Sequence, residues 1–246
     1  MPSEIIPNKE LRKKLIENAN EKKLSHVGSA LSCLDFVNYL YDNVLLEDDI
    51  FILSKGHGAM ALYTALERKG KKPQWNMHPE IDEKNGIYAT TGSLGHGFPI
   101  ALGRAFAKKF ERKKGKVYVL LGDGEMAEGS IWETLILANR FKLDNLHIFV
   151  DWNKYGGLTD EVKELFDFDK ESLAQRIRAF GFKTTVINGH DENELKLIKS
   201  FNDPKTIFIL DTVKGKGVDI LEKTHFHGYL FHQNPEEYKK TFESLS

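Results

Sequence analysis

Two short segments of the chain carry residue types that suit a divalent metal ion and a diphosphate group. Asn153 follows Asp123 by 30 residues, and the two would supply an amide and a carboxylate oxygen, the hard ligands that Mg²⁺ prefers. The main-chain carbonyl of Tyr155 is a plausible third ligand. Gly122 and Gly124, on either side of Asp123, would let a diphosphate approach without a Cβ in the way. The segments predict a magnesium and diphosphate site, although glycine and aspartate also serve simple turns.

Both segments follow an apolar run that is typical of a buried strand. Residues 117–121 lead into the first and residues 146–150 into the second. Between them, residues 128–141 carry apolar side chains at helical spacing. A strand, helix, strand unit places the carboxyl ends of its strands at one edge of a parallel sheet, where open α/β sheets bind ligands. We therefore expect the two segments to lie close together.

Further motifs occur in a fixed order along the chain, and together they resemble the amino-terminal half of transketolase, a thiamine diphosphate enzyme. The motifs are Ser25-His26-Val27-Gly28-Ser29, Leu53-Ser54-Lys55-Gly56-His57-Gly58, His78-Pro79-Glu80, Thr91-Gly92-Ser93-Leu94-Gly95-His96-Gly97, Gly122-Asp123-Gly124 with Glu128, Asp151-Trp152-Asn153, Asn188-Gly189-His190-Asp191, Thr212-Val213-Lys214-Gly215-Lys216-Gly217 and His227-Gly228. They run from about residue 10 to residue 230. The resemblance implies the thiamine diphosphate-binding fold.

The resemblance also implies which residues hold the cofactor. Magnesium would be bound by Asp123, Asn153 and Tyr155. The expected cofactor-binding residues are Gly92, Ser93, Leu94, Gly122, Asp123, Gly124, Glu128 and Asn153. Each has a structural alternative: Asp123 and Asn153 would serve as helix or turn caps, and residues 92–94 as a simple helix start. Glu128 suits the positive end of a helix dipole, and in the family it also lies at the contact with the other cofactor-binding domain.

Four of the nine histidines occupy motifs whose histidine faces the substrate or the diphosphate in transketolases. These predicted catalytic residues are His26, His57, His78 and His227. Imidazole suits the task because its pKa of about 6.5 lets it donate or accept a proton near neutral pH. The other assignments are weaker. A turn and cap role suffices for His190, His147 reads as structural, and His96 replaces the glutamine usual in the family.

Two departures from the family concern the substrate side of the site. The family commonly has a proline shortly after His227-Gly228, where this chain continues with residues 229–232. The 21 residues from His57 to His78 are fewer than the family leads us to expect. A shorter segment over the substrate channel would widen the mouth of the site and admit a bulkier or nucleotide-linked sugar. Lys214 and Lys216 read either as solvated turn residues or as weak contributors to anion binding near the entrance.

Composition limits the class of protein. With 246 residues and 41% hydrophobic residues, the chain can bury one substantial core, so we expect a single diphosphate-binding domain over 1–246, with a short extension after about residue 231. A net charge of −1 provides no basic footprint for nucleic acid and no polybasic membrane anchor. The single cysteine excludes an intrachain disulfide, and no signal peptide or membrane span is evident, which favours a cytoplasmic protein.

Alternating helical and strand patterns predict a three-layer α/β/α fold with a mostly parallel central sheet. The first strand is expected at about 50–53, later strands at 182–187 and 206–213, and helices at 97–111, 160–166, 171–180 and 191–201. Asn8 is expected to cap the first helix, and Ser32 with Asp35 resembles a capping box for the next. Gly181 suits a left-handed helix end.

The resemblance implies an enzyme divided between two polypeptides. Thiamine diphosphate would bind between this chain and a separately encoded subunit that holds the aminopyrimidine and supplies an activating glutamate. We expect a heterotetramer with two copies of each subunit, which transfers a two-carbon ketol unit from a ketose to an aldose. The rival interpretations are another thiamine diphosphate enzyme (2-oxo acid decarboxylating or deoxyxylulose phosphate synthase-like) and a silent scaffold protein. A nicotinamide-dependent enzyme ranks last, because no Gly-x-Gly-x-x-Gly follows the first strand.

Overall fold

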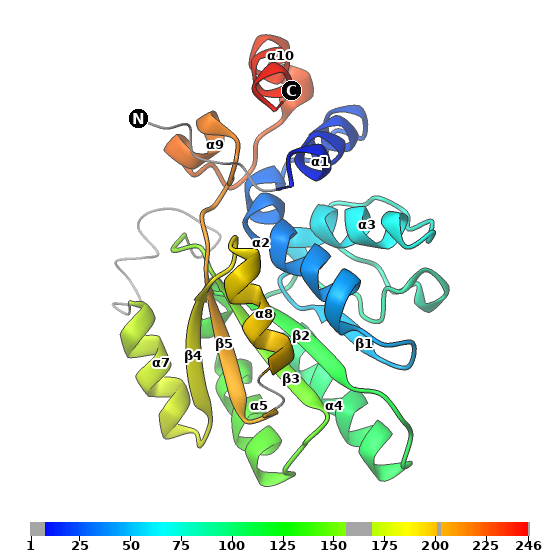
Figure 1. Cartoon of the computed structure of the whole chain (residues 1–246), viewed down its shortest axis with the longest axis vertical. Helices are drawn as coiled ribbons and strands as arrows, with labels where there is room; N and C mark the ends of the chain where they lie inside the picture. The colour runs from blue at the N-terminus through cyan, green and yellow to red at the C-terminus, as the bar shows by residue number, and fades with distance from the viewer. Residues whose placement is uncertain (1–7, 156–168, 201–202, 246) are drawn as a thin grey trace.

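The described strands form one parallel sheet, which agrees with the buried apolar runs of its central strands. The computed structural model describes residues 8–155, 169–200 and 203–245, which contain a five-stranded sheet in the order β1-β2-β3-β5-β4 (Figure 1). The strands are β1 (Ile50–Leu53), β2 (Val117–Gly122), β3 (Leu146–Trp152), β4 (Lys183–Asn188) and β5 (Thr206–Asp211). Every neighbouring pair is parallel, so the carboxyl ends of all five strands meet at one edge.

Helices cover both faces of this sheet. The α-helices are α1 (Lys9–Glu21), α2 (Val27–Tyr39), α3 (Ala59–Arg68), α4 (Gly97–Phe110), α5 (Gly129–Arg140), α7 (Lys170–Ala179), α8 (Glu192–Ser200), α9 (Asp219–Thr224) and α10 (Pro235–Ser244). Short turns of other helix types are η1 (Leu40–Val44), η2 (Gly56–Gly58), η3 (Glu83–Asn85), η4 (Gly124–Ala127) and η5 (Phe231–Gln233). The predicted helix at 160–166 lies outside the described residues.

Side-chain alternation along the strands divides the interior into two apolar cores. In β2, Tyr118 and Leu120 belong to a core shared with α1, α2, α3 and α8, whereas Val117, Val119 and Leu121 belong to a core shared with α4, α5 and α7. Figure 1 shows α2 and α8 on one face of the sheet and α4 and α5 on the other. The predicted three-layer α/β/α arrangement is confirmed.

The predicted capping box at Ser32 and Asp35 is wrong. Helix α2 begins at Val27, upstream of both residues, and every residue of α2 is buried. Asp35 therefore lies inside the helix, where a buried carboxylate needs strong partners. Arg12 supplies them, with Nη1 at 2.9 Å and Nη2 at 2.6 Å from the two carboxylate oxygens.

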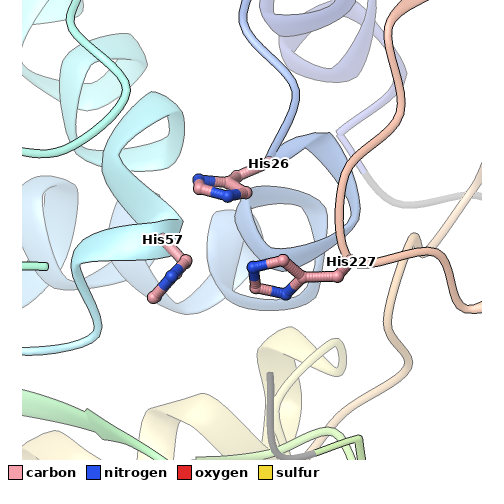
Figure 2. Close-up of side chains that lie close together, drawn as sticks. All are labelled: His26, His57 and His227. Atoms are coloured by element: carbon pink, nitrogen blue, oxygen red, sulfur yellow. The ribbon is translucent and has the colours of Figure 1, made fainter. Parts of the chain in front are cut away.

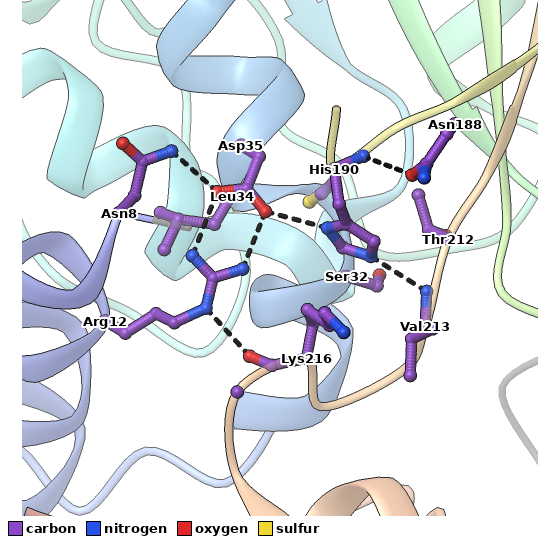
Figure 3. Close-up of polar contacts among 12 residues, drawn as sticks. Asn8, Arg12, Ser32, Leu34, Asp35, Asn188, His190, Thr212, Val213 and Lys216 are labelled. Carbon is purple, nitrogen blue, oxygen red and sulfur yellow. Dashed lines mark hydrogen bonds and ion pairs between the residues drawn. The ribbon is translucent and has the colours of Figure 1, made fainter. Parts of the chain in front are cut away.

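Asn8 occupies the N-cap position of α1, but its side chain makes no cap hydrogen bond. Its Nδ2 instead donates to Asp35 at 2.7 Å. His190 lies on the other side of the same carboxylate, with Nδ1 at 2.7 Å from Asp35, and its Nε2 accepts from the backbone N–H of Val213 at 2.9 Å (Figure 3). His190 thus does more than the predicted turn and cap role, because it ties α2 to the loop after β5.

The remaining boundaries differ little from those predicted. Strand β5 ends at Asp211 rather than residue 213, and α4 ends at Phe110. Gly181 follows α7 with a φ of 89°, as its predicted left-handed role requires. After residue 231, η5 and α10 pack against α1, and Phe231 and Leu245 belong to the first apolar core. Among the described helices, none combines the length and apolarity needed to cross a membrane.

Candidate active site

A hollow opens at the carboxyl edge of the sheet, where the segments after β1, β2 and β3 meet. Its lining residues are Ser29, Lys55, His57, Leu94, Gly122, Asp123, Gly124, Glu125, Asn153 and Lys214. The two segments that suggested a metal and diphosphate site therefore face one space, because β2 and β3 are paired with Gly122 opposite Asp151. Of the predicted cofactor residues, Gly92, Ser93 and Glu128 do not line this hollow.

Asp123 combines a structural role with an unfavourable burial. Its Oδ1 accepts from the N–H of Gly124 at 2.8 Å, and its Oδ2 accepts from the N–H of Lys154 at 2.6 Å. The side chain thus caps η4, as the structural alternative proposed. Burial nevertheless raises the pKa of Asp123 to about 6, in spite of the nearby charge of Lys55. A cation bound in the hollow would stabilise this carboxylate.

Asn153 is buried beside Asp123 and is held by two hydrogen bonds. Its Nδ2 donates to Ser32 Oγ at 3.3 Å, and its Oδ1 accepts from the N–H of Tyr155 at 3.2 Å. The Tyr155 ring stacks on His225 with centroids 3.8 Å apart, and its hydroxyl lies 2.7 Å from His225 Nε2. These contacts fix the segment that carries the predicted ligands, while ligation by the Tyr155 carbonyl stays a prediction.

A buried ion pair that sequence reasoning did not single out lies beneath these residues. Lys55 Nζ donates to Asp151 Oδ2 and, at 2.7 Å, to Ser32 Oγ. Asp151 also accepts from Ser32 Oγ at 2.6 Å and from Thr212 Oγ1. Burial opposes the charge of Lys55, yet Asp151 holds the pKa of Lys55 above its ordinary value. Because Ser32 also contacts Asn153, this network connects the ion pair to a predicted metal ligand.

Glu125, which the sequence analysis did not single out, is a second buried acidic residue that lines the hollow. Its fully buried carboxylate accepts from Gly122 N–H at 2.9 Å, Gly95 N–H at 3.0 Å and Ser54 Oγ at 2.6 Å. It therefore braces three loops around the hollow. Glu128 lies at the N-cap of α5 with no side-chain cap hydrogen bond, and it is half-buried against Gly95.

The loop at 91–97 is shaped by close contacts with the other motifs. Gly92 has a φ of 141°, and a Cβ there would lie 2.9 Å from the His78 ring. A Cβ on Gly56 would lie 2.6 Å from the backbone N of Gly92. Leu94 reaches the hollow, whereas Ser93 and His96 are exposed. Glycine at 56 and 92 is thus required for these loops to meet.

The four predicted catalytic histidines, His26, His57, His78 and His227, form one cluster beside the hollow. Neighbouring rings have centroids 4.6–5.2 Å apart. His57 belongs both to the cluster and to the lining of the hollow. Within the described residues, the buried nitrogens Nδ1 of His26, Nε2 of His78 and Nδ1 of His227 have no hydrogen-bond partner.

Burial and mutual proximity keep this cluster uncharged at neutral pH. Burial, together with the neighbouring histidines, lowers the pKa of His26 to about 4 and that of His57 to about 3. Burial also lowers the pKa values of His78 and His227. Neutral imidazoles each present one N–H donor and one lone pair, so the cluster can hydrogen-bond several hydroxyls of a bound molecule.

His147 and the basic loop after β5 take different places. His147 is buried in β3 and stacks on Tyr118 with centroids 4.9 Å apart, which agrees with its predicted structural role. Lys214 is buried and lines the hollow, so the loop after β5 contributes more to the site than its solvated-turn alternative suggested. Its Nζ also lies 5.5 Å from the centre of the Tyr155 ring.

Comparison with known proteins agrees with this architecture. The family described as "Transketolase, thiamine diphosphate binding domain" matches residues 9–242. The chain is 36% identical to one of the subunits of the apulose-4-phosphate transketolase of Phocaeicola vulgatus, over 96% of this chain and 91% of the relative. It is 34% identical to the 6-deoxy-6-sulfo-D-fructose transketolase subunit SqwG of Clostridium sp. strain MSTE9, over 86% and 85% of the two chains.

Solved structures are similar over nearly the whole chain. Transketolase from Campylobacter jejuni superposes with a TM-score of 0.79 at 28% identity, over 96% of this chain and 42% of that one. Transketolase from Leishmania mexicana superposes with a TM-score of 0.82 at 22% identity, over 96% and 40% of the two chains, a likeness that concerns the fold alone. This chain thus spans about two-fifths of the length of these solved transketolases. With its thiamine diphosphate-binding fold confirmed, the chain belongs to the transketolase family of thiamine diphosphate-dependent enzymes.

Proposed function

We propose that this chain is the diphosphate- and magnesium-binding subunit of a two-subunit transketolase. The enzyme would transfer a two-carbon ketol unit from a ketose donor to an aldose acceptor. The observation that best supports this function is the convergence of Asp123, Asn153 and His57 on one hollow, with three further histidines beside it. Two similar proteins are named as subunits of transketolases, which favours a divided enzyme.

The residues present fit thiamine diphosphate and magnesium. Asp123 and Asn153 offer two oxygen donors side by side, and Gly122 and Gly124 leave the backbone open to a diphosphate. Thiamine diphosphate supplies the electron sink that ketol transfer needs. In this proposal Lys214 neutralises phosphate charge at the rim of the hollow, and Leu94 packs against the cofactor.

The histidine cluster would handle the sugar. His26, His57, His78 and His227 present uncharged donors and acceptors that can orient hydroxyl groups and move protons between them. The short separation of His57 from His78 supports a mouth wide enough for a bulky or nucleotide-linked acceptor. The two relatives are named for apulose 4-phosphate and 6-deoxy-6-sulfofructose, so sugar preference differs even among similar subunits.

A second subunit would complete the site. It would hold the aminopyrimidine of the cofactor and supply the activating glutamate, and two copies of each subunit would form a cytoplasmic heterotetramer. Glu128, half-buried at the start of α5, would face this partner. Without the partner the chain would have little or no activity.

Calorimetric titration tests the proposal. Thiamine diphosphate with Mg²⁺ is titrated into the chain alone, and then into the chain mixed with the product of a neighbouring gene that encodes the other half of a transketolase. Binding that tightens with the partner and disappears with a chelator is expected, followed by ketol transfer from a screened ketose. Binding without ketol transfer would favour another thiamine diphosphate reaction, and absence of binding from both samples would favour a silent scaffold.

A further inference from the structure

Three of the clustered histidines surround one common space (Figure 2). One ring nitrogen from each of His26, His57 and His227 lies within 4.8 Å of the other two. Figure 2 shows the three rings around a common space, although they come from the start of α2, from η2 and from the loop after α9. Three separate elements therefore each bring an imidazole group to the same point.

The ligand set is selective. Three imidazole nitrogens suit Zn²⁺, Co²⁺, Ni²⁺ or Cu²⁺, whereas Mg²⁺ and Ca²⁺ prefer oxygen. No carboxylate belongs to this group of three among the described residues. A tetrahedral zinc ion with three histidine ligands keeps its fourth position for water or another ligand. This site would thus differ in metal preference from the oxygen site at Asp123 and Asn153.

The rings can approach to the distances that a metal needs. Zinc to nitrogen bonds of about 2.0–2.1 Å place tetrahedral ligand atoms roughly 3.4 Å apart, so nitrogens that now lie within 4.8 Å of one another must close by up to about 1.4 Å. The Nδ1 atoms of His26 and His227 have no hydrogen bond to break, within the part of the chain that the structure describes. His57 and His227 are only half-buried, which leaves an ion a path to the cluster.

From this geometry we infer that His26, His57 and His227 form a binding site for a divalent transition-metal ion of the zinc type, separate from the magnesium site. This inference does not depend on the proposed ketol transfer, because it concerns only the residues of this chain. A bound ion would occupy the space in which the proposed function places the sugar.

Titration with Co²⁺ tests the inference, because the visible absorption bands of tetrahedral Co²⁺ are much more intense than those of octahedral Co²⁺. The full chain should bind about one ion with these bands, and Zn²⁺ should displace it while excess Mg²⁺ should not. His57→Ala should weaken binding by more than about 100-fold, since loss of an outer hydrogen-bond partner alone costs about 10- to 100-fold.

Two variants separate this site from other sources of binding. His232→Ala, in η5 and outside the cluster, should leave Co²⁺ affinity and spectrum unchanged. Asp123→Asn should also leave both unchanged, which distinguishes the nitrogen site from the oxygen site. If circular dichroism shows that His57→Ala is misfolded, His227→Ala provides the same comparison. Absence of the tetrahedral bands, or equal affinity in the folded cluster variant and the His232→Ala control, would overturn the inference.

Discussion

Two polar regions lie side by side at the edge of the sheet and differ in how well their polar atoms are paired. Lys55, Asp151 and Ser32 form a buried network in which each side chain has at least one charged or hydroxyl partner. In the histidine cluster, by contrast, buried nitrogens of His26 and His227 have no partner among the described residues. The first region is paired within the protein, whereas the second keeps nitrogens that a bound molecule can reach.

This difference in pairing indicates two roles: the paired network supports the fold, and the histidine cluster recognises a ligand. A fully paired network in a low-dielectric interior is rigid, and through Ser32 it fixes Asn153. The buried nitrogens of the cluster can bond to a ligand without breaking a hydrogen bond within the described residues, and with four imidazoles together this favours recognition. We therefore expect substitutions in the network to affect folding, and substitutions in the hollow and cluster to affect binding.

The largest effect is expected from Lys55→Met, which leaves Asp151 charged, buried and without its cation. Breaking one side of a buried ion pair costs about 3–5 kcal/mol, so the free energy of unfolding should fall by that amount. Urea denaturation measures it. The matched control is Lys109→Met in the exposed pair with Asp144, where a change below about 1 kcal/mol is expected. Equal effects at both sites would show that the network is not a supporting element.

Asp123→Asn should act chiefly on binding. Burial raises the pKa of Asp123, so an uncharged amide removes an unfavourable buried charge. Its NH₂ would nevertheless face one of the two backbone N–H groups that now donate to the carboxylate, so the free energy of unfolding should fall by no more than about 1–3 kcal/mol. If Asp123 is a magnesium ligand as proposed, its loss should weaken Mg²⁺-dependent binding of thiamine diphosphate by about 100-fold or more. Calorimetry on the complex with its partner measures this, and Asn153→Ala should act in the same direction. Unchanged affinity in both variants would refute the assigned magnesium ligands.

The cluster should make stability depend on pH in a defined direction. His26 and His57 have folded pKa values of about 4 and 3, below an unfolded value of about 6.5, so protons bind more readily to the unfolded chain. Their contribution is complete above about pH 6.5 and is lost as pH falls toward 4. Between about pH 7.5 and 5.5 each would cost about 1.4 kcal/mol, and because both rings are partly solvated we expect about 1–2 kcal/mol for the pair.

Urea denaturation at the two pH values measures this loss. The double variant His26→Gln, His57→Gln should have a shallower pH dependence than the natural chain by about 1–2 kcal/mol. His147, whose pKa burial lowers to about 4, contributes independently from the sheet, so His147→Gln should reduce the dependence by its own share. A double variant whose pH profile parallels that of the natural chain would show that the cluster is not held neutral by folding.

The sequence predicts the position of a site residue well where its motif lies at the end of a strand. It predicts the role of a residue less well where that role depends on burial. The Asp123 and Asn153 segments and the four histidines lie close together as predicted, because parallel strands bring their carboxyl ends to one edge. Lys55 stands within a motif of the family, but nothing in its spacing indicates a buried partner 96 residues away. Asp35 does not cap a helix as predicted, but pairs with the buried Arg12. The local sequence around a capping carboxylate can be the same as that around a carboxylate paired with a buried arginine, so the sequence could not distinguish the two roles.

Glu125 and Glu128, which lie close to the start of α5, also differ in how well they are paired. Substitution of Glu128 has the smallest expected effect on stability. Glu128 makes no cap hydrogen bond, so Glu128→Ala should change the free energy of unfolding by no more than about 0.5 kcal/mol. Glu125→Gln should cost about 1–3 kcal/mol, because an amide NH₂ would face a backbone N–H that now donates to the carboxylate. Urea denaturation of the two variants measures the difference.

The same Glu128→Ala variant should weaken association with the partner subunit, if the exposed edge of this side chain forms the proposed contact. Sedimentation of the mixed subunits, with Glu133→Ala on the same helix as the control, measures that association. A variant that is as stable as the natural chain but associates less would assign Glu128 to the interface. Loss of stability without loss of association would instead place Glu128 with Glu125 among the residues that support the loops. Since the sequence alone favours Glu128 and the structure buries Glu125, the pair tests whether an acidic residue at this turn serves the fold or the assembly.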